Sequence, residues 1–172
     1  MEELNRLSAD DFHQSAKNPV ILILDNIRSM HNVGSIFRTA DAFRVDAIFL
    51  CGYTPQPPHR DIHKTALGAT ETVQWQYFSL AIDAVKEARA RNFSIWAVEQ
   101  TDMSTPLYSF QPALPGTALV LGNEVEGVAD NLLTLCDGSI EIPQWGMKHS
   151  LNVSVAAGIV LWEITRHTFI KH

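Results

Sequence analysis

The stretch PVILILDNI, residues 19–27, is a short and almost continuous apolar run bounded by proline and asparagine. Such a run is typical of a strand buried on both faces, as in a parallel sheet. The apolar residues of NVGSIFRTADAF, residues 32–43, then recur at helical spacing, with Asn32 as the predicted N-cap. VDAIFLCG, residues 45–52, predicts the next buried strand. The order strand, helix, strand indicates an α/β domain with a parallel sheet.

The same alternation continues along the rest of the chain. We predict strands over 73–78, 93–99, 117–122 and 139–143, and helices over 62–70, 79–92 and about 129–136, with a long last helix from near Ser150. The predicted fold is therefore α/β, with a mostly parallel sheet flanked by helices. One domain is expected over 1–172, with a short helical extension over about 1–18.

Composition excludes several classes of protein. The chain has 172 residues, 46% of them hydrophobic, which suits one globular core. No apolar run reaches the roughly 18–20 residues of a membrane span, and the acidic start MEELNRLSADDF is unlike a targeting peptide. Cys51 and Cys136 fit neither a disulfide framework nor a zinc site. We expect a cytoplasmic protein without a membrane anchor or a metal.

The formal net charge of −6 argues against a protein that coats nucleic acid through bulk electrostatics. Residues 26–64 are nevertheless net positive, with Arg28, Arg38, Arg44, Arg60 and Lys64 against Asp41, Asp46 and Asp61. A local basic patch and scattered solvated charge both remain open on this pattern.

Three polar stretches that contain glycine follow or adjoin predicted strands, where parallel sheets bind ligands. They are DNIRSMHNVGSIFRTA (25–40), LGNEVEGV (121–128) and IPQWGMKHSLNVS (142–154). The second lacks the lysine and hydroxyl of a phosphate loop, and its Glu124 suits a hydroxyl, an amine or a guanidinium better than a phosphate. A turn with solvated carboxylates is the alternative reading.

Two predicted helices, which are otherwise largely apolar, also contain polar residues. Arg38 is a cation inside the 32–43 helix that either reaches the strand ends or extends to solvent. Ser150 and Asn152 lie at the start of an otherwise apolar helix, where unpaired polar groups would cost about 1–3 kcal/mol each when buried. They therefore need partners or a function.

NVGSIFRTAD (32–41), LVLGNEVEGV (119–128) and IEIPQWGMKHSLNVSVAAGIVLWE (140–163) closely resemble, in order and spacing, the three signature motifs of the SpoU (TrmH) family. These are RNA ribose 2′-O-methyltransferases of the SPOUT class, which use S-adenosyl-L-methionine. The resemblance implies a SPOUT fold whose C-terminal segment forms a deep trefoil knot, a topology otherwise nearly absent from proteins. It also implies a homodimer. Gln144-Trp145 departs from the methionine of many relatives, which puts the pocket there in doubt.

The resemblance implies roles for two sets of residues. The catalytic set is Arg38, Asn32, Glu124, Ser150 and Asn152, and the cofactor-binding set is Val98, Glu99, Gly122, Ile142 and Leu151. Arginine has a pKa above about 12 and therefore stays protonated at neutral pH. We expect Arg38 to orient the ribose hydroxyl and a phosphate rather than to act as a free base.

The expected substrate is a nucleotide in structured RNA. Without a separate RNA-binding domain, the compact chain favours tRNA over rRNA. Two other functions remain open: a catalytically inactive RNA-binding protein, and a methyltransferase that acts on a small molecule.

Overall fold

The computed structural model describes residues 14–112, 114–147 and 150–169. The strands in this part are β1 (Asn18–Asp25), β2 (Val45–Cys51), β3 (Trp75–Phe78), β4 (Phe93–Val98), β5 (Thr105–Pro106), β6 (Gly116–Leu121) and β7 (Gly138–Glu141). The helices are α2 (Met30–Ala42), α3 (Arg60–Ala66), α4 (Ala69–Thr72), α5 (Ala81–Ala90), α6 (Asp130–Leu133) and α7 (Val153–Phe169), with a 3₁₀ turn η1 (Leu107–Ser109). The extension expected over 1–18 falls mostly outside the described residues.

The strands form one sheet in the order β3-β2-β1-β6-β4-β7-β5, and every strand pair is parallel. This confirms the predicted parallel α/β fold. From β1, the strands β2 and β3 follow one another to one edge of the sheet. On the other side of β1 lies β6, which separates β1 from β4. The order in which the chain adds strands therefore reverses between β1 and β6. Parallel sheets bind ligands at such a point, beyond the carboxyl ends of the strands.

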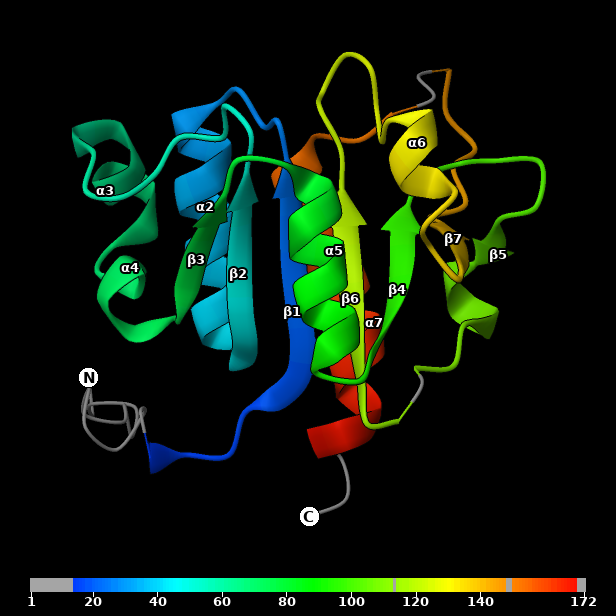
Figure 1. Cartoon of the computed structure of the whole chain (residues 1–172), viewed down its shortest axis with the longest axis horizontal. Coiled ribbons are helices and arrows are strands. Elements are labelled where there is room, and N and C mark those ends of the chain that lie inside the picture. The colour runs from blue at the N-terminus through cyan, green and yellow to red at the C-terminus, as the bar shows by residue number, and fades with distance from the viewer. Residues whose placement is uncertain (1–13, 113, 148–149, 170–172) are drawn as a thin grey trace.

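Helices cover both faces of the sheet (Figure 1), because alternate residues of each central strand point to opposite sides. In β1, Val20, Leu22 and Leu24 belong to the core that packs under α2, α3, α4 and α7. Ile21 and Ile23 belong to a second core under α5 and α6. Burial on both faces explains why β1 reads as a continuous apolar run rather than an alternating one.

Two helix starts differ from the prediction. The N-cap of α2 is Ser29, whose side chain accepts the Asn32 N–H, so Asn32 is not the cap. Asn32 instead lies inside the first turn, with its amide free for other contacts. The last helix begins at Val153 rather than near Ser150, because Asn152 caps it: its Oδ1 accepts the N–H of Ser154 at 2.9 Å.

Two further segments differ. The single helix predicted over 62–70 is two short helices, since Leu67 and Gly68 adopt left-handed conformations between α3 and α4. The segment 101–116, for which the sequence predicted neither a strand nor a helix, contains β5 and η1.

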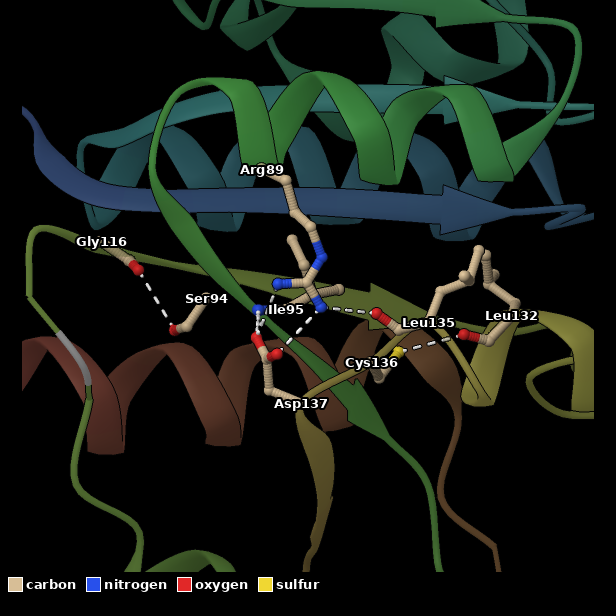
Figure 2. A network of polar contacts seen from close by, with 8 residues as sticks. All are labelled: Arg89, Ser94, Ile95, Gly116, Leu132, Leu135, Cys136 and Asp137. Atoms are coloured by element: carbon tan, nitrogen blue, oxygen red, sulfur yellow. Dashed lines mark hydrogen bonds and ion pairs between the residues drawn. The ribbon is translucent and has the colours of Figure 1, made fainter.

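An ion pair holds the start of β7 against α5, at the amino ends of the strands (Figure 2). Arg89 contacts both carboxylate oxygens of Asp137, the shorter distance being 2.9 Å, and donates to the carbonyl of Leu135 at 2.7 Å. Asp137 also accepts the Ile95 N–H at 2.7 Å. Burial alone would raise the pKa of Asp137, but these bonds outweigh it and hold the pKa below its ordinary value.

A search of the described residues for helices that are both long and apolar enough to cross a membrane finds none.

Candidate functional site

A cavity of about 350 Å³ lies beyond the carboxyl ends of β4, β6 and β7, within the range of roughly 300–1,000 Å³ for small-molecule sites. Three segments wall it: residues 98–100, residues 121–127, and part of 140–156. All five residues of the expected cofactor-binding set line it, namely Val98, Glu99, Gly122, Ile142 and Leu151.

Glycines let the 121–127 loop fold tightly against itself. A Cβ on Gly122 would collide with the backbone of Gly127, and Gly127 has a φ of +70°, which favours glycine. Glu99 braces the loop from β4, because its Oε2 accepts the Val128 N–H at 3.1 Å. One wall of the cavity is therefore a loop fixed by backbone contacts.

Asn123 organises this loop from within. Its side chain is only 6% exposed. Its Oδ1 accepts the N–H groups of Val125 and Glu126, and its Nδ2 donates to the carbonyl of Asn26 and the hydroxyl of Tyr53. Asn123 thus ties the loop to the segment that follows β1 and to the segment that follows β2.

Three of the expected catalytic residues form a continuous hydrogen-bonded chain beside the cavity, which we call the amide relay. Asn152 donates from Nδ2 to Oδ1 of Asn32 at 3.0 Å, and Asn32 donates from Nδ2 to Oε1 of Glu124 at 3.1 Å. The other carboxylate oxygen, Oε2, accepts the backbone N–H of Arg28 at 3.2 Å. Residues from α2, the 121–127 loop and the start of α7 are thereby joined.

The relay has only one consistent orientation. At one end, ionised Glu124 can only accept, so Asn32 must turn its NH₂ group toward it. At the other end, helix α7 presents backbone N–H donors, so Asn152 must turn its oxygen toward the helix and its NH₂ toward Asn32. Both amides are therefore fixed by their surroundings.

The charge of Glu124 is part of this arrangement. Burial would raise its pKa, but hydrogen bonds from its own backbone N–H, from Asn32, and from the backbone of Arg28 and Ser29 outweigh that effect. The net result is a pKa below the ordinary value, so Glu124 is ionised at neutral pH.

The other two expected catalytic residues lie apart from the relay. Ser150 is exposed and lines the cavity. Arg38 is exposed on α2, six positions after Asn32, and has no hydrogen bond or ion pair with any described residue. Its guanidinium group is thus available to a ligand from outside the chain.

The lining of the cavity combines negative charge with apolar surface. Glu99, Glu124, Glu126 and Glu141 contribute carboxylates. Leu121, Ile140, Val153 and Ala156 are among the apolar residues. A ligand with a positive charge, hydroxyl groups and an apolar part would suit this lining better than a phosphate would. Over the described ranges, no cluster of histidine, cysteine and acidic side chains could hold a metal ion.

Sequence reasoning missed Asn123 and Tyr53, which position the loop and its surroundings. Asn123 was recognisable in principle, because an asparagine in a turn often accepts the backbone N–H two residues ahead, as Asn123 does from Val125. Tyr53 gave no signal, since its contact partner is 70 residues away in the chain.

The sequence model of the SpoU rRNA Methylase family matches residues 19–162. The chain is 36% identical over 166 residues to an enzyme of Pasteurella multocida named 23S rRNA (guanosine-2′-O-)-methyltransferase RlmB, covering 96% of this chain and 67% of that protein. It thus spans about two thirds of that relative's length.

Two solved structures are similar in fold, each with a TM-score of 0.82. One is the AdoMet-bound rRNA methyltransferase from Sinorhizobium meliloti, 26% identical, covering 91% of this chain and 60% of that one. The other is the A. aeolicus TrmH/SpoU tRNA modifying enzyme, 28% identical, covering 95% and 83%. The family match confirms the resemblance of the three motifs, and the chain belongs to the SpoU rRNA Methylase family.

Proposed function

We propose that the chain transfers a methyl group from S-adenosyl-L-methionine to a ribose 2′-hydroxyl of RNA. The observation that carries the proposal is the amide relay, which joins Asn32, Glu124 and Asn152 at a cavity with an acidic and apolar lining. The names of the relatives support it, because they describe ribose methylation and an AdoMet-bound enzyme.

The acidic and apolar lining of the cavity suits the charge and the apolar parts of the methyl donor. When bound, S-adenosyl-L-methionine supplies an electrophilic methyl group on a positively charged sulfur. Val98, Ile142 and Leu151 would contact its apolar parts, while Glu99 and the loop at Gly122 would offer polar atoms. The surrounding carboxylates favour a cation there.

The protein's own contribution would be to position the acceptor. Ordering the reacting groups can lower a barrier by several kcal/mol, about 7–11 in favourable cases. Arg38 is exposed on α2 and makes no hydrogen bond or ion pair with any described residue, and we assign it to the phosphate next to the target ribose. The relay and Ser150 would hold the ribose hydroxyl, whose proton leaves to solvent as the oxygen–carbon bond forms and the carbon–sulfur bond breaks.

The RNA class is the part of the proposal that the relatives inform least. The 36% identical relative is named for 23S rRNA, which favours rRNA, against the preference for tRNA drawn from the compact chain. The structurally similar A. aeolicus enzyme is named for tRNA. We therefore propose rRNA as the first substrate to test.

The experiment is transfer of labelled methyl groups from S-adenosyl-L-methionine into separated, unmodified rRNA and tRNA, followed by mapping of 2′-O-methyl sites. We expect label in one RNA class at one position. Cofactor binding with label only in small molecules would support the small-molecule methyltransferase. RNA binding without cofactor binding would support the inactive RNA-binding protein.

We further propose a homodimer that pairs through α7. Val155, Ile159 and Trp162, spaced four and three apart, leave an exposed apolar stripe on this helix. Val160, which the apolar pattern alone would also offer for an interface, is fully buried in the protomer core, so a charge there would unfold the protein instead of separating subunits. Ile159→Glu is the better test: sedimentation should show monomers with an unchanged circular dichroism spectrum.

The trefoil knot implied by the family resemblance, a single domain over 1–172 and a cytoplasmic location also remain proposals. Residues of 121–127, of 140–144 and of 150–151 share the cavity, as two loops of such a knot would. Tracing residues 113–169 in an experimental density map tests the knot directly.

A further inference from the structure

A basic and aromatic surface, formed by Arg28 and Tyr53, adjoins the amide relay, and neither residue lines the cavity. The guanidinium carbon of Arg28 lies 6.0 Å from the ring centroid of Tyr53, and both residues are exposed, the tyrosine by 56%. The backbone N–H of Arg28 is the group that binds Glu124, so the pair is one residue contact away from the relay. The function proposed above gives the Arg28 side chain no role, and it uses Tyr53 only as a hydrogen-bond partner of Asn123.

Tyr53 is held in place at two points. Its hydroxyl oxygen accepts a hydrogen bond from Nδ2 of the buried Asn123 at 3.1 Å, and its backbone N–H donates to Oδ1 of Asn26, also at 3.1 Å. The chain enters Tyr53 through Gly52, whose φ of +62° directs the tyrosine outward from β2. An exposed aromatic ring fixed at both ends loses little conformational freedom when a ligand binds it.

Arg28 supplies an available charge beside this ring. Its side chain has no ion pair with any described residue, in contrast to Arg89 and Arg91, which pair with carboxylates. The cavity itself is acidic and would repel a phosphate, whereas this neighbouring surface would attract one. The site thus separates a region for a cationic cofactor from a region for an anionic substrate.

An exposed aromatic ring with an adjacent guanidinium matches the way proteins bind unpaired nucleotides, by stacking on the base and contacting the phosphate. We propose that Tyr53 and Arg28 form a stacking platform for an unpaired RNA base that flanks the target nucleotide. This inference rests on the proposed function, since it assigns the platform to the same RNA substrate.

The test is a measurement of RNA affinity with purified variants and the RNA class that the wild-type protein methylates. Tyr53→Leu keeps apolar bulk but removes the stacking face, and should raise the Kd for RNA about tenfold. Tyr53→Phe keeps the ring and should stay within about threefold of wild type. Tyr108→Leu is the matched control, because Tyr108 is also exposed, lies on η1 after β5 at the opposite edge of the sheet, and should change nothing.

Arg28 is tested in the same assay. Arg28→Ala should weaken RNA binding and reduce the slope of log Kd against log salt by about 1, the value for one lost phosphate contact. Arg28→Lys should restore the salt slope but only part of the affinity. Cofactor affinity, measured by calorimetry with S-adenosyl-L-methionine alone, should stay within twofold in the Arg28 variants and in Tyr108→Leu, and should change less than RNA affinity does in the Tyr53 variants.

Several outcomes would overturn the inference without touching the proposed function. Equal RNA affinity for wild type and Tyr53→Leu, in a protein that methylates RNA, would do so. So would a matching loss of cofactor affinity in Tyr53→Leu, which would mean that the ring only supports the loop through Asn123. If the wild-type protein transfers no methyl group to any RNA, the proposed function fails first, and the platform fails with it.

Discussion

The amide relay makes Asn152 a residue with two separable tasks. Its oxygen caps α7, accepting the N–H of Ser154, while its NH₂ group donates to Asn32. Asn152→Asp keeps the capping oxygen but replaces the donor by a second acceptor. Asn152→Ala removes both. The two variants should therefore differ in stability while both lose activity.

The stability effects follow from the helix terminus. Loss of an N-cap costs about 1 kcal/mol, which for a chain of this size lowers Tm by roughly 2–4 °C in the alanine variant. The aspartate variant keeps the cap, and a negative charge at a helix N-terminus contributes about 0.3–1 kcal/mol in favour, so its Tm should lie above that of the alanine variant.

The activity effect follows from the orientation of the amides. An aspartate would face Oδ1 of Asn32 across the present 3.0 Å contact, acceptor against acceptor. If Asn32 rotates its amide to relieve this, its oxygen meets the carboxylate of Glu124 instead. One bond is lost in either case, worth about 1–3 kcal/mol, so kcat/KM should fall by roughly 5- to 100-fold.

Thermal unfolding by circular dichroism and incorporation of labelled methyl into RNA measure the two effects on the same samples. A fully active Asn152→Asp protein beside an inactive Asn152→Ala protein would refute the relay, since only the cap would then matter.

Arg38→Ala should abolish methyl transfer while leaving cofactor affinity within a few-fold, and Arg38→Lys should also fail because an ammonium lacks the planar fork; near-normal turnover of Arg38→Lys would remove the role we assign. The pKa of Glu124 is below its ordinary value of 4.5, so its charge is lost only as the pH falls through the depressed value. The acidic decline of kcat/KM that Glu124 causes should therefore lie below pH 4.5. A decline at about pH 6 that disappears in Glu124→Gln would contradict this. Asp137→Ala should lower the free energy of unfolding by about 1 kcal/mol at pH 7. Because the pKa of Asp137 is also depressed, that difference should shrink as the pH falls through its folded value, and a urea-unfolding difference that is constant down to pH 2 would disprove the ion-pair account.

The layered fold was predictable because its central strands are apolar throughout. The run over 19–27 has polar residues only at its end, and a chain that alternates such runs with helical spacing has few arrangements available. Strand order was not predictable, since nothing in residues 116–121 indicates that they pair with β1 rather than with a sequence neighbour.

The site was predictable as a set of residues but not as a set of contacts. Asn32 was interpreted as a helix cap because asparagine favours that position, and Ser29, three residues earlier, takes it instead. The difference matters because Asn32, inside the first turn, has its side-chain oxygen available to accept the hydrogen bond from Asn152. Short-range preferences identify which side chains are polar and out of place, whereas their partners lie 92 and 120 residues away.

The insertion of β6 beside β1 has a consequence for biosynthesis. Val20 pairs with Thr117, so one edge of the most apolar strand waits for roughly 100 further residues to be made. At a synthesis rate of about 5–20 residues per second, that wait is on the order of 5–20 s. During this interval PVILILD has β2 on one side and an unpaired edge on the other, the condition under which strands of different chains join. A nascent chain of this protein should therefore bind a ribosome-associated chaperone from the appearance of β2 until β6 emerges.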